Sequence, residues 1–249
     1  MREFGLIGYP LGHSFSKKYF SEKFCKEGIE AGYELFAIPD LDRDTLYRLL
    51  AEKPDLVGFN VTVPYKEKIA ALCDSLSEDA AAIGAVNTVR VSRHSGGEIS
   101  LHGYNTDWQA FRDSVKPVIA GGIRKALVLG TGGAAKAVVY ALQSLQVDVT
   151  PVSRRRREGI IAYQDLNAAI MDEHKLIVNT TPLGMWPEIG NAPEIPYEHV
   201  GGDHFCYDIV YNPEVTEFMR RCASRGASVK NGLAMLHGQA ELAWKIWNS

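Results

Sequence analysis

The chain has 249 residues, of which 46 % are hydrophobic and 23 % are charged, so it has the composition of an ordinary globular protein with one large or two modest domains. The formal net charge of −3 argues against nucleic-acid binding, and no apolar run approaches the roughly 18 residues of a membrane span. The N-terminus has no signal-peptide pattern and the four cysteines match no CxxC spacing, so we expect a reduced, cytoplasmic protein.

Short β-rich runs alternate with segments of helical periodicity, which predicts an α/β fold with mainly parallel strands. We expect strands over residues 5–8, 33–38, 56–59, 86–91, 98–104, 125–129, 147–153, 176–180 and 207–210. Helices are expected over residues 16–27, 41–51, 107–118, 134–145, 214–225 and 233–247. Asp40 is the expected N-cap of the second helix. Because the pattern restarts, we predict two domains, residues 1–103 joined by the C-terminal helix 232–249, and residues 104–231.

A glycine-rich turn, G-T-G-G-A-A at residues 130–135, follows an expected strand and opens the next helix. Gly130 permits the tight turn, Gly132 lets the backbone approach a pyrophosphate, and a small last residue lets helix and strand pack together. Gly133 and Ala134 begin the helix, whose N-terminus offers free N–H groups and a positive dipole end. An ordinary tight turn is the alternative, but this strand–turn–helix context favours a Rossmann-like dinucleotide-binding domain.

The residues after the following strand indicate which dinucleotide binds. An NAD site places a carboxylate about 20 residues beyond the glycines, whereas here Ser153 is followed by four arginines, residues 154–157. A guanidinium can bind a 2′-phosphate through two parallel hydrogen bonds. Ser153, Arg154 and Arg155 are therefore candidate contacts and NADP(H) is the expected cofactor, the alternative being a solvated basic loop.

Three polar clusters lie in the first domain or at its border, beside expected strand ends, where α/β sheets bind ligands. They consist of Ser14 and Ser16; of Asn60, Thr62 and Lys66; and of Asn87, Asn105 and Asp107. The two serines precede an expected helix, where they either bind a carboxylate or cap the helix. His13 stands beside them, and we expect it to be structural. The seven histidines form no HExxH motif, so no metal site is predicted.

Eight sequence segments, in order along nearly the whole chain, resemble the shikimate dehydrogenase family. They are L-G-H-S-F-S (11–16), N-V-T-V-P-Y-K (60–66), G-A-V-N-T (84–88), N-T-D (105–107), the glycine turn (130–137), N-T-T-P-L-G-M (179–185), Y-D-I-V-Y-N-P (207–213) and N-G-L-A-M-L (231–236). The resemblance implies an N-terminal substrate domain and a Rossmann-like NADP domain. It also implies the reversible, NADPH-dependent reduction of 3-dehydroshikimate to shikimate in aromatic amino acid biosynthesis.

The resemblance also implies a role for each candidate residue. The ring carboxylate would be held by Ser14 and Ser16, and the rest of the ring by Asn60, Thr62, Asn87, Asp107, Tyr211 and Gln239. The nicotinamide would lie near Thr180, Ile209, Val210, Gly232 and Met235. Lys66 and Asp107 would flank the reacting hydroxyl, where Lys66 can stabilise negative charge and donate a proton. We expect these two residues to titrate as a coupled pair.

Two features depart from the family pattern. Trp108 stands where the family has glycine after N-T-D. Only six residues, 154–159, join the strand ending at Ser153 to the apolar run 160–163, whereas a parallel crossover needs a dozen or more. We therefore predict no helix in this shortened crossover, no parallel pairing of residues 160–163 with the neighbouring strand, and weaker burial of the adenine ring.

Two other functions stay open. One is a quinate/shikimate dehydrogenase of broader specificity; the missing acidic residue after the second strand disfavours NAD but says nothing about quinate. The other is a non-catalytic dinucleotide-sensing module, which would need the glycine turn but not Lys66 with Asp107. We expect a small-molecule substrate, no nucleic-acid or membrane partner, and a monomer or homodimer.

Overall fold

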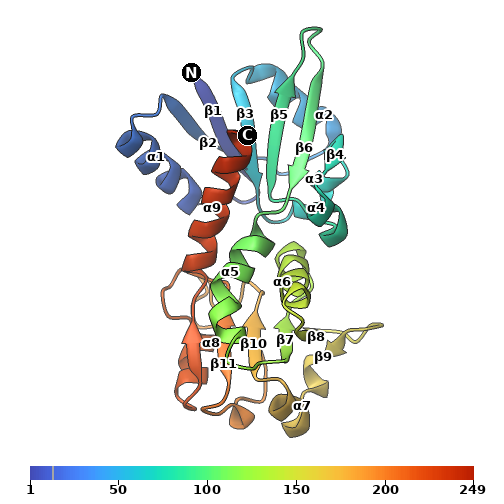
Figure 1. The fold of residues 1–249 in the computed structure, drawn as a ribbon, viewed down its shortest axis with the longest axis vertical. Coiled ribbons are helices and arrows are strands. Elements are labelled where there is room, and N and C mark those ends of the chain that lie inside the picture. Colours follow the sequence, from blue (N-terminus) through green and yellow to red (C-terminus); the bar gives the residue numbers. More distant parts are fainter. Residues whose placement is uncertain (13) are drawn as a thin grey trace. The chain divides into compact units, whose positions relative to one another are not determined.

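The computed structural model describes residues 1–12 and 14–249 and divides into two compact units. Unit 1 comprises Met1–Thr106 and Ala240–Ser249, and unit 2 comprises Asp107–Gln239. The predicted division after residue 103 lies three residues before the end of the first segment of unit 1, and the one before residue 232 lies eight residues before Ala240. His13 lies outside the described residues. The predicted α/β class is confirmed, since each unit is a sheet covered by helices (Figure 1).

Unit 1 contains a six-stranded mixed sheet with the strand order β2-β1-β3-β5-β6-β4 (Figure 1). The strands are β1 (Arg2–Gly8), β2 (Ala31–Ala37), β3 (Leu56–Val61), β4 (Ser75–Leu76), β5 (Thr88–Arg93) and β6 (Ile99–Tyr104). β1 pairs in parallel with β2 and β3, and β4 pairs in parallel with β6. β5 is antiparallel to both β3 and β6, which confirms the predicted pair of strands around the turn at residues 95–97.

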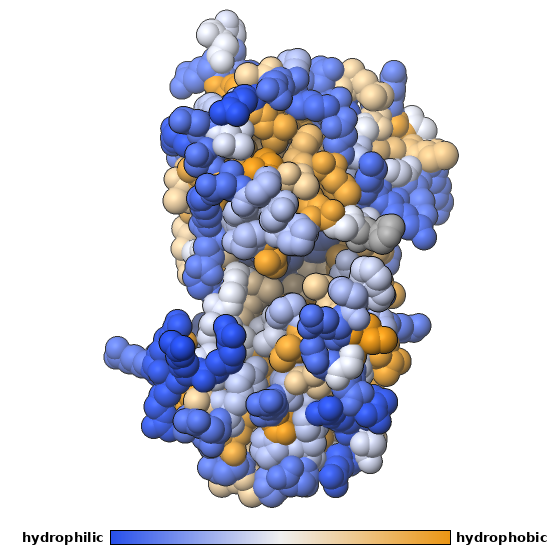
Figure 2. All heavy atoms as spheres, turned by 180° about the vertical axis from the view of Figure 1, so that it is seen from behind, coloured by the Kyte–Doolittle hydropathy of each residue, from blue (hydrophilic) through white to orange (hydrophobic). Residues whose placement is uncertain are grey.

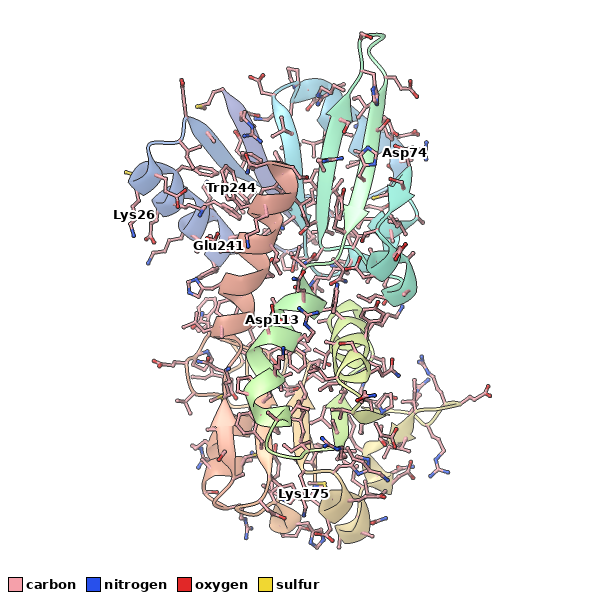
Figure 3. All side chains as sticks on the ribbon, in the orientation of Figure 1. Lys26, Asp74, Asp113, Lys175, Glu241 and Trp244 are labelled. Atoms are coloured by element: carbon pink, nitrogen blue, oxygen red, sulfur yellow. The ribbon has the colours of Figure 1, made fainter. Side chains whose placement is uncertain are left out.

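Helices cover both faces of this sheet, and each face has its own apolar core (Figure 1). The helices are α1 (Phe15–Glu27) and the end of α9 (Leu233–Trp247) on one face, and α2 (Arg43–Glu52), α3 (Lys66–Ala70) and α4 (Glu78–Ile83) on the other. Trp247 packs on Phe4, with ring centroids 4.8 Å apart, and its indole N–H donates to the Val89 carbonyl at 3.0 Å. Glu241, which Figure 3 labels on α9, accepts hydrogen bonds from Tyr19 and Lys23 of α1. These contacts fix the last turns of α9 on unit 1.

The N-cap of α2 is Asp42, so the prediction of Asp40 was wrong. The Asp42 carboxylate accepts the backbone N–H of Thr45 at 2.8 Å. Leu41 is fully buried in the core, which keeps the chain extended through Asp42 and delays the start of the helix. Asp40 instead pairs with Lys68 at 3.2 Å on the surface.

Unit 2 contains a six-stranded sheet in which every neighbouring pair is parallel. Its order is β12-β11-β10-β7-β8-β9, from the strands β7 (Lys125–Leu129), β8 (Asp148–Ser153), β9 (Ile161–Ala162), β10 (Leu176–Asn179), β11 (Phe205–Asp208) and β12 (Ser228–Lys230). One face carries α5 (Asp107–Ile119) and α6 (Gly133–Ser144), and the other carries α7 (Ala168–Glu173) and α8 (Glu217–Ala223) (Figure 1). The strand sequence changes direction between β7 and β10, which is the switch point of the doubly wound dinucleotide-binding fold.

The shortened crossover joins β8 to β9. Residues 154–160, all of which the structure describes, contain no helix, so that prediction is confirmed. The prediction that residues 160–163 form no parallel pair was wrong, because two residues pair in parallel with β8. The pairs are Val152 with Ile161 and Ser153 with Ala162. The chain reverses in a tight turn in which Arg157 and Ile160 exchange backbone hydrogen bonds of 3.0 Å. A short link suffices because only two residues have to align.

The described part of the chain contains no helix that is both long and apolar enough to cross a membrane.

Candidate active site

Two predicted substrate residues, Asn60 and Asn87, are joined in unit 1 by the pairing of β3 with β5. The Asn60 amide N–H donates to the Thr88 hydroxyl at 3.1 Å and to the Asn87 carbonyl at 3.3 Å. The Asn87 side chain in turn accepts the Thr106 N–H at 2.7 Å and donates to the Thr106 hydroxyl at 2.9 Å. All four residues are buried. The result is a preorganised set of amide and hydroxyl groups at the carboxyl end of β3.

Ser14 and Ser16 lie at the N-terminus of α1. Ser14 is the N-cap, and its hydroxyl accepts the Lys17 N–H at 3.4 Å. Ser16 is hydrogen-bonded to the Tyr33 hydroxyl, which donates to the side-chain amide oxygen (Oδ1) of Asn60 at 2.8 Å. Burial raises the pKa of Tyr33, so this phenol stays a donor. Tyr33 thus connects two predicted substrate residues, although a tyrosine in a β-strand carries no sequence signal for such a role.

Lys66 and Thr62 frame the turn between β3 and α3. Lys66 is the first residue of α3 and half-buried, and its carbonyl accepts the Val86 N–H at 2.7 Å, next to Asn87. The Thr62 carbonyl accepts the Tyr65 N–H at 3.0 Å. These bonds place an ammonium group at the turn that follows Asn60 along the chain.

The other residues predicted to handle substrate belong to unit 2. Asp107 is the first residue of α5 and is buried, and Gln239 is buried with its amide donating to the Leu236 carbonyl at 3.0 Å. Tyr211 is half-buried, and burial raises the pKa of its phenol. Trp108 packs edge-on against the Tyr140 ring, with centroids 5.1 Å apart.

The glycine turn of unit 2 occupies the switch point of the parallel sheet. Gly130 has φ +113°, which favours glycine, and a Cβ there would lie 2.7 Å from the Thr180 hydroxyl. The Gly130 N–H donates to the Val152 carbonyl at 2.8 Å, and the Thr180 hydroxyl donates to the Leu129 carbonyl at 2.6 Å. The predicted residues Gly130 and Thr180 are therefore brought together where β7 and β10 end.

Gly132 is the N-cap of α6 and has no side chain that could occupy the helix N-terminus. A Cβ added at Gly132 would meet no atom within 4 Å, and the residue is exposed. Gly133 and Ala134 then open a helix of 12 residues. The uncapped helix N-terminus, its positive dipole end and the open space beside Gly132 fit a pyrophosphate.

A second group of predicted cofactor residues follows β11. The Val210 N–H donates to the Asp208 carboxylate at 3.0 Å, and the Val210 carbonyl accepts the Gly232 N–H at 3.1 Å. A Cβ on Gly232 would overlap the Ile209 carbonyl, so the two backbones are in direct contact. Met235 lies in the first turn of α9 and is buried. Four predicted residues, 209, 210, 232 and 235, thus lie on two adjoining segments.

The arginine run lies on the shortened crossover, which projects from unit 2 as a strongly hydrophilic arm (Figure 2). The Ser153 hydroxyl accepts the Arg155 N–H at 3.2 Å, which shapes the turn after β8. Arg154 and Arg155 are exposed. Arg156 instead pairs with Asp165 at 3.0 Å, and this hydrogen bonding lowers the pKa of Asp165. Arg156 therefore fastens the arm, whereas Arg154 and Arg155 are available to a ligand.

The doubly wound sheet with a glycine-lined switch point defines unit 2 as a dinucleotide-binding unit of the class found in NAD(P)-dependent oxidoreductases. A family model described as the shikimate dehydrogenase substrate binding domain matches residues 6–89. The shikimate dehydrogenase (NADP(+)) of Caldicellulosiruptor saccharolyticus is 36 % identical over 262 residues, covering 99 % of this chain and 92 % of that protein. The chain belongs to the shikimate dehydrogenase family.

Solved structures agree with this membership. The shikimate dehydrogenase of Aquifex aeolicus superposes with a TM-score of 0.85 at 34 % identity, over 99 % of this chain and 92 % of that one. The enzyme of Thermus thermophilus, solved in complex with NADP(H) and shikimate, gives a TM-score of 0.82 at 33 % identity, over 99 % and 93 % of the two chains. The similarity therefore extends over both units.

Proposed function

We propose that the chain is an NADP-dependent shikimate dehydrogenase that reversibly reduces 3-dehydroshikimate to shikimate, a step of aromatic amino acid biosynthesis. The observation that carries the proposal is the combination of two half-sites in one chain. Unit 1 offers Lys66 beside the Asn60–Asn87 cluster, and unit 2 offers a glycine-lined switch point. A dinucleotide sensor would need only the half-site of unit 2.

The two units take different tasks in this proposal. Residues 1–103 with helix 232–249 form the substrate domain, and residues 104–231 form the Rossmann-like NADP domain. The buried, hydrogen-bonded amides of unit 1 suit a polyhydroxylated ring, because each presents a donor and an acceptor in fixed positions. The ligands of this ring are Ser14 and Ser16 at the carboxylate, and Asn60, Thr62, Asn87, Asp107, Tyr211 and Gln239 elsewhere.

NADP(H), when bound, supplies or accepts the hydride. Residues Gly130, Gly132, Gly133 and Ala134 hold the pyrophosphate, and Ser153, Arg154 and Arg155 hold the 2′-phosphate. The nicotinamide is bordered by Thr180, Ile209, Val210, Gly232 and Met235. The shortened crossover buries the adenine ring less than a crossover with a helix would. The charged 2′-phosphate therefore contributes a larger share of the affinity for NADP(H).

Lys66 and Asp107 handle the proton. A ketone that accepts hydride develops negative charge on its oxygen, and the Lys66 ammonium stabilises that charge and donates a proton to the oxygen. In the oxidative direction Lys66 accepts the hydroxyl proton. Asp107, the first residue of α5, is the second catalytic group of this proposal.

The proposal is tested by mixing the protein with shikimate and NADP and following NADPH absorbance, then repeating the assay with quinate and with NAD. Lys66→Ala should lower kcat by about 10²- to 10⁴-fold with a much smaller change in KM. Lys68→Ala, in the same short helix but paired with Asp40 at the surface, should leave kcat unchanged. An unchanged kcat in Lys66→Ala would remove that residue from catalysis.

The same assays separate the alternatives. NADPH binding without turnover of shikimate would identify a sensor, and comparable turnover of quinate would identify the broader specificity. We also propose a cytoplasmic monomer or homodimer with no nucleic-acid or membrane partner. Size-exclusion chromatography with light scattering measures that oligomeric state.

A further inference from the structure

A fully buried carboxylate, Asp208, lies at the carboxyl end of β11 and takes no part in the chemistry proposed above. Three neutral groups donate hydrogen bonds to it. They are the Thr216 hydroxyl at 2.6 Å, the Asn179 amide at 3.0 Å and the Val210 N–H at 3.0 Å. Thr216 and Asn179 are themselves fully buried. Burial of a charged group is costly unless it is fully hydrogen-bonded, so this carboxylate and its three donors act as one unit.

The Asp208 carboxylate connects two loops that leave neighbouring strands. Asn179 lies opposite Asp208 in the register of β10 and β11. The Asn179 side-chain oxygen accepts two hydrogen bonds from Thr181, one from its backbone N–H at 3.0 Å and one from its hydroxyl at 2.7 Å. Asn179 therefore sets the path of the first loop, which follows β10. In the second loop, Asp208 fixes Val210 directly. The first loop carries Thr180 and the second carries Ile209 and Val210.

These loops carry the residues proposed to border the nicotinamide, so they form one end of the dinucleotide half-site. Gly232 belongs to the same end, because its N–H donates to the Val210 carbonyl at 3.1 Å. The other end, at Arg154 and Arg155, follows β8 and shares no hydrogen bond with Asp208 among those described for residues 1–12 and 14–249. A change at Asp208 should therefore act on one end of a dinucleotide and spare the other.

We propose that Asp208 is a positioning residue for the nicotinamide half of the NADP(H) site, acting through Asn179 and Val210, an inference that rests on the proposed function. A carboxylate accepts from all three donors at once. An asparagine has one acceptor oxygen and an amide that donates, so Asp208→Asn leaves the Thr216 hydroxyl without its acceptor. The neutral amide oxygen also accepts the Asn179 amide and the Val210 N–H less strongly than the carboxylate does, so the two loops keep only a weaker common support.

The experiment measures binding of two probes to the full chain by calorimetry. NADPH covers both ends of the half-site, and adenosine 2′,5′-bisphosphate covers only the adenosine end. Asp208→Asn should raise the Kd of NADPH about five- to tenfold, the effect of weakening one charge-assisted hydrogen bond, and leave the Kd of the bisphosphate within twofold. The matched control is Asp203→Asn, an exposed carboxylate that precedes β11 and pairs with Lys175; both affinities should stay unchanged.

A second pair of variants tests the same inference if Asp208→Asn does not fold. Thr216→Val removes the hydroxyl that donates to Asp208, and Thr216→Ser keeps it, so only the valine variant should weaken NADPH selectively. Equal weakening of both probes, or an NADPH affinity within twofold of wild type, would overturn the positioning role. Failure of the wild-type protein to bind NADPH would instead overturn the proposed function, and the inference with it.

Discussion

Replacing Gly232 by alanine should remove most of the turnover while the protein stays folded. The Gly232 backbone is fixed on both sides, since its N–H donates to the Val210 carbonyl at 3.1 Å and its carbonyl accepts the Leu236 N–H at 2.9 Å. A Cβ would lie 2.9 Å from the Ile209 Cα and nearer still to the Ile209 carbonyl. Ordinary contacts of this kind begin near 3.4 Å. The backbone at residues 209–210 therefore has to move by about 1 Å, by the size of this overlap.

A displacement of about 1 Å in groups that position a reactant costs on the order of 100-fold in rate. We therefore expect Gly232→Ala to lower kcat/KM for NADP about 100-fold in the shikimate assay. Gly190→Ala is the control, because a Cβ there would meet no atom within 4 Å. Circular dichroism and thermal melting would establish that both variants are folded. If Gly232→Ala kept kcat/KM within threefold of wild type, the methyl group would be accommodated without moving Ile209 and Val210, and the reasoning would be refuted.

Three further predictions concern stability and thiol reactivity. Trp247→Phe should lower the free energy of unfolding by about 2–3 kcal/mol, because it leaves the Val89 carbonyl without the indole donor and reduces core packing; a urea midpoint equal to wild type would contradict this. Because burial raises the pKa of Asp208 from 3.8 to about 6, the folded protein binds the proton more tightly than the unfolded chain. Wild type should therefore gain stability relative to Asp208→Asn as pH falls from about 6 to about 4, by on the order of 3 kcal/mol, whereas a pH-independent difference would disprove the buried ionisation. In the folded protein only the exposed Cys25 should react rapidly with a thiol reagent and the other three cysteines only after denaturation; more than one fast thiol would show that the cores open.

Much of the fold could be predicted because its strands are buried runs bounded by clear signals. The strand at residues 125–129 was predicted at its observed bounds, since apolar residues lie between a charged residue and Gly130. Helices α3, α4 and α7 were missed because five or six residues are too few to show helical periodicity. The α2 cap was misplaced because two aspartates flank Leu41, and only the burial of that leucine decides between them.

The candidate site could be predicted where the sequence has residue types that the packing of a core does not require. Glycines at a strand–helix turn and amides just beyond a strand end are such signals, and the structure brings two of the candidate residues, Asn60 and Asn87, into contact. Tyr33 and Asp208 were not found, because a tyrosine in a β-strand and an aspartate at a strand end are common in any sheet. Their importance comes from hydrogen bonds to residues distant in sequence, such as Asn60 and Asn179.

The tight turn of the shortened crossover gives a point of attachment for a reporter group. Glu158 and Gly159 are exposed, and the only backbone hydrogen bonds described around them join Arg157 to Ile160. Loop tips of this kind tolerate insertions, because no buried backbone group loses its partner. A fluorophore placed there would stand a few residues from Arg154 and Arg155. It would convert the binding of a nucleotide phosphate at these arginines into an optical signal.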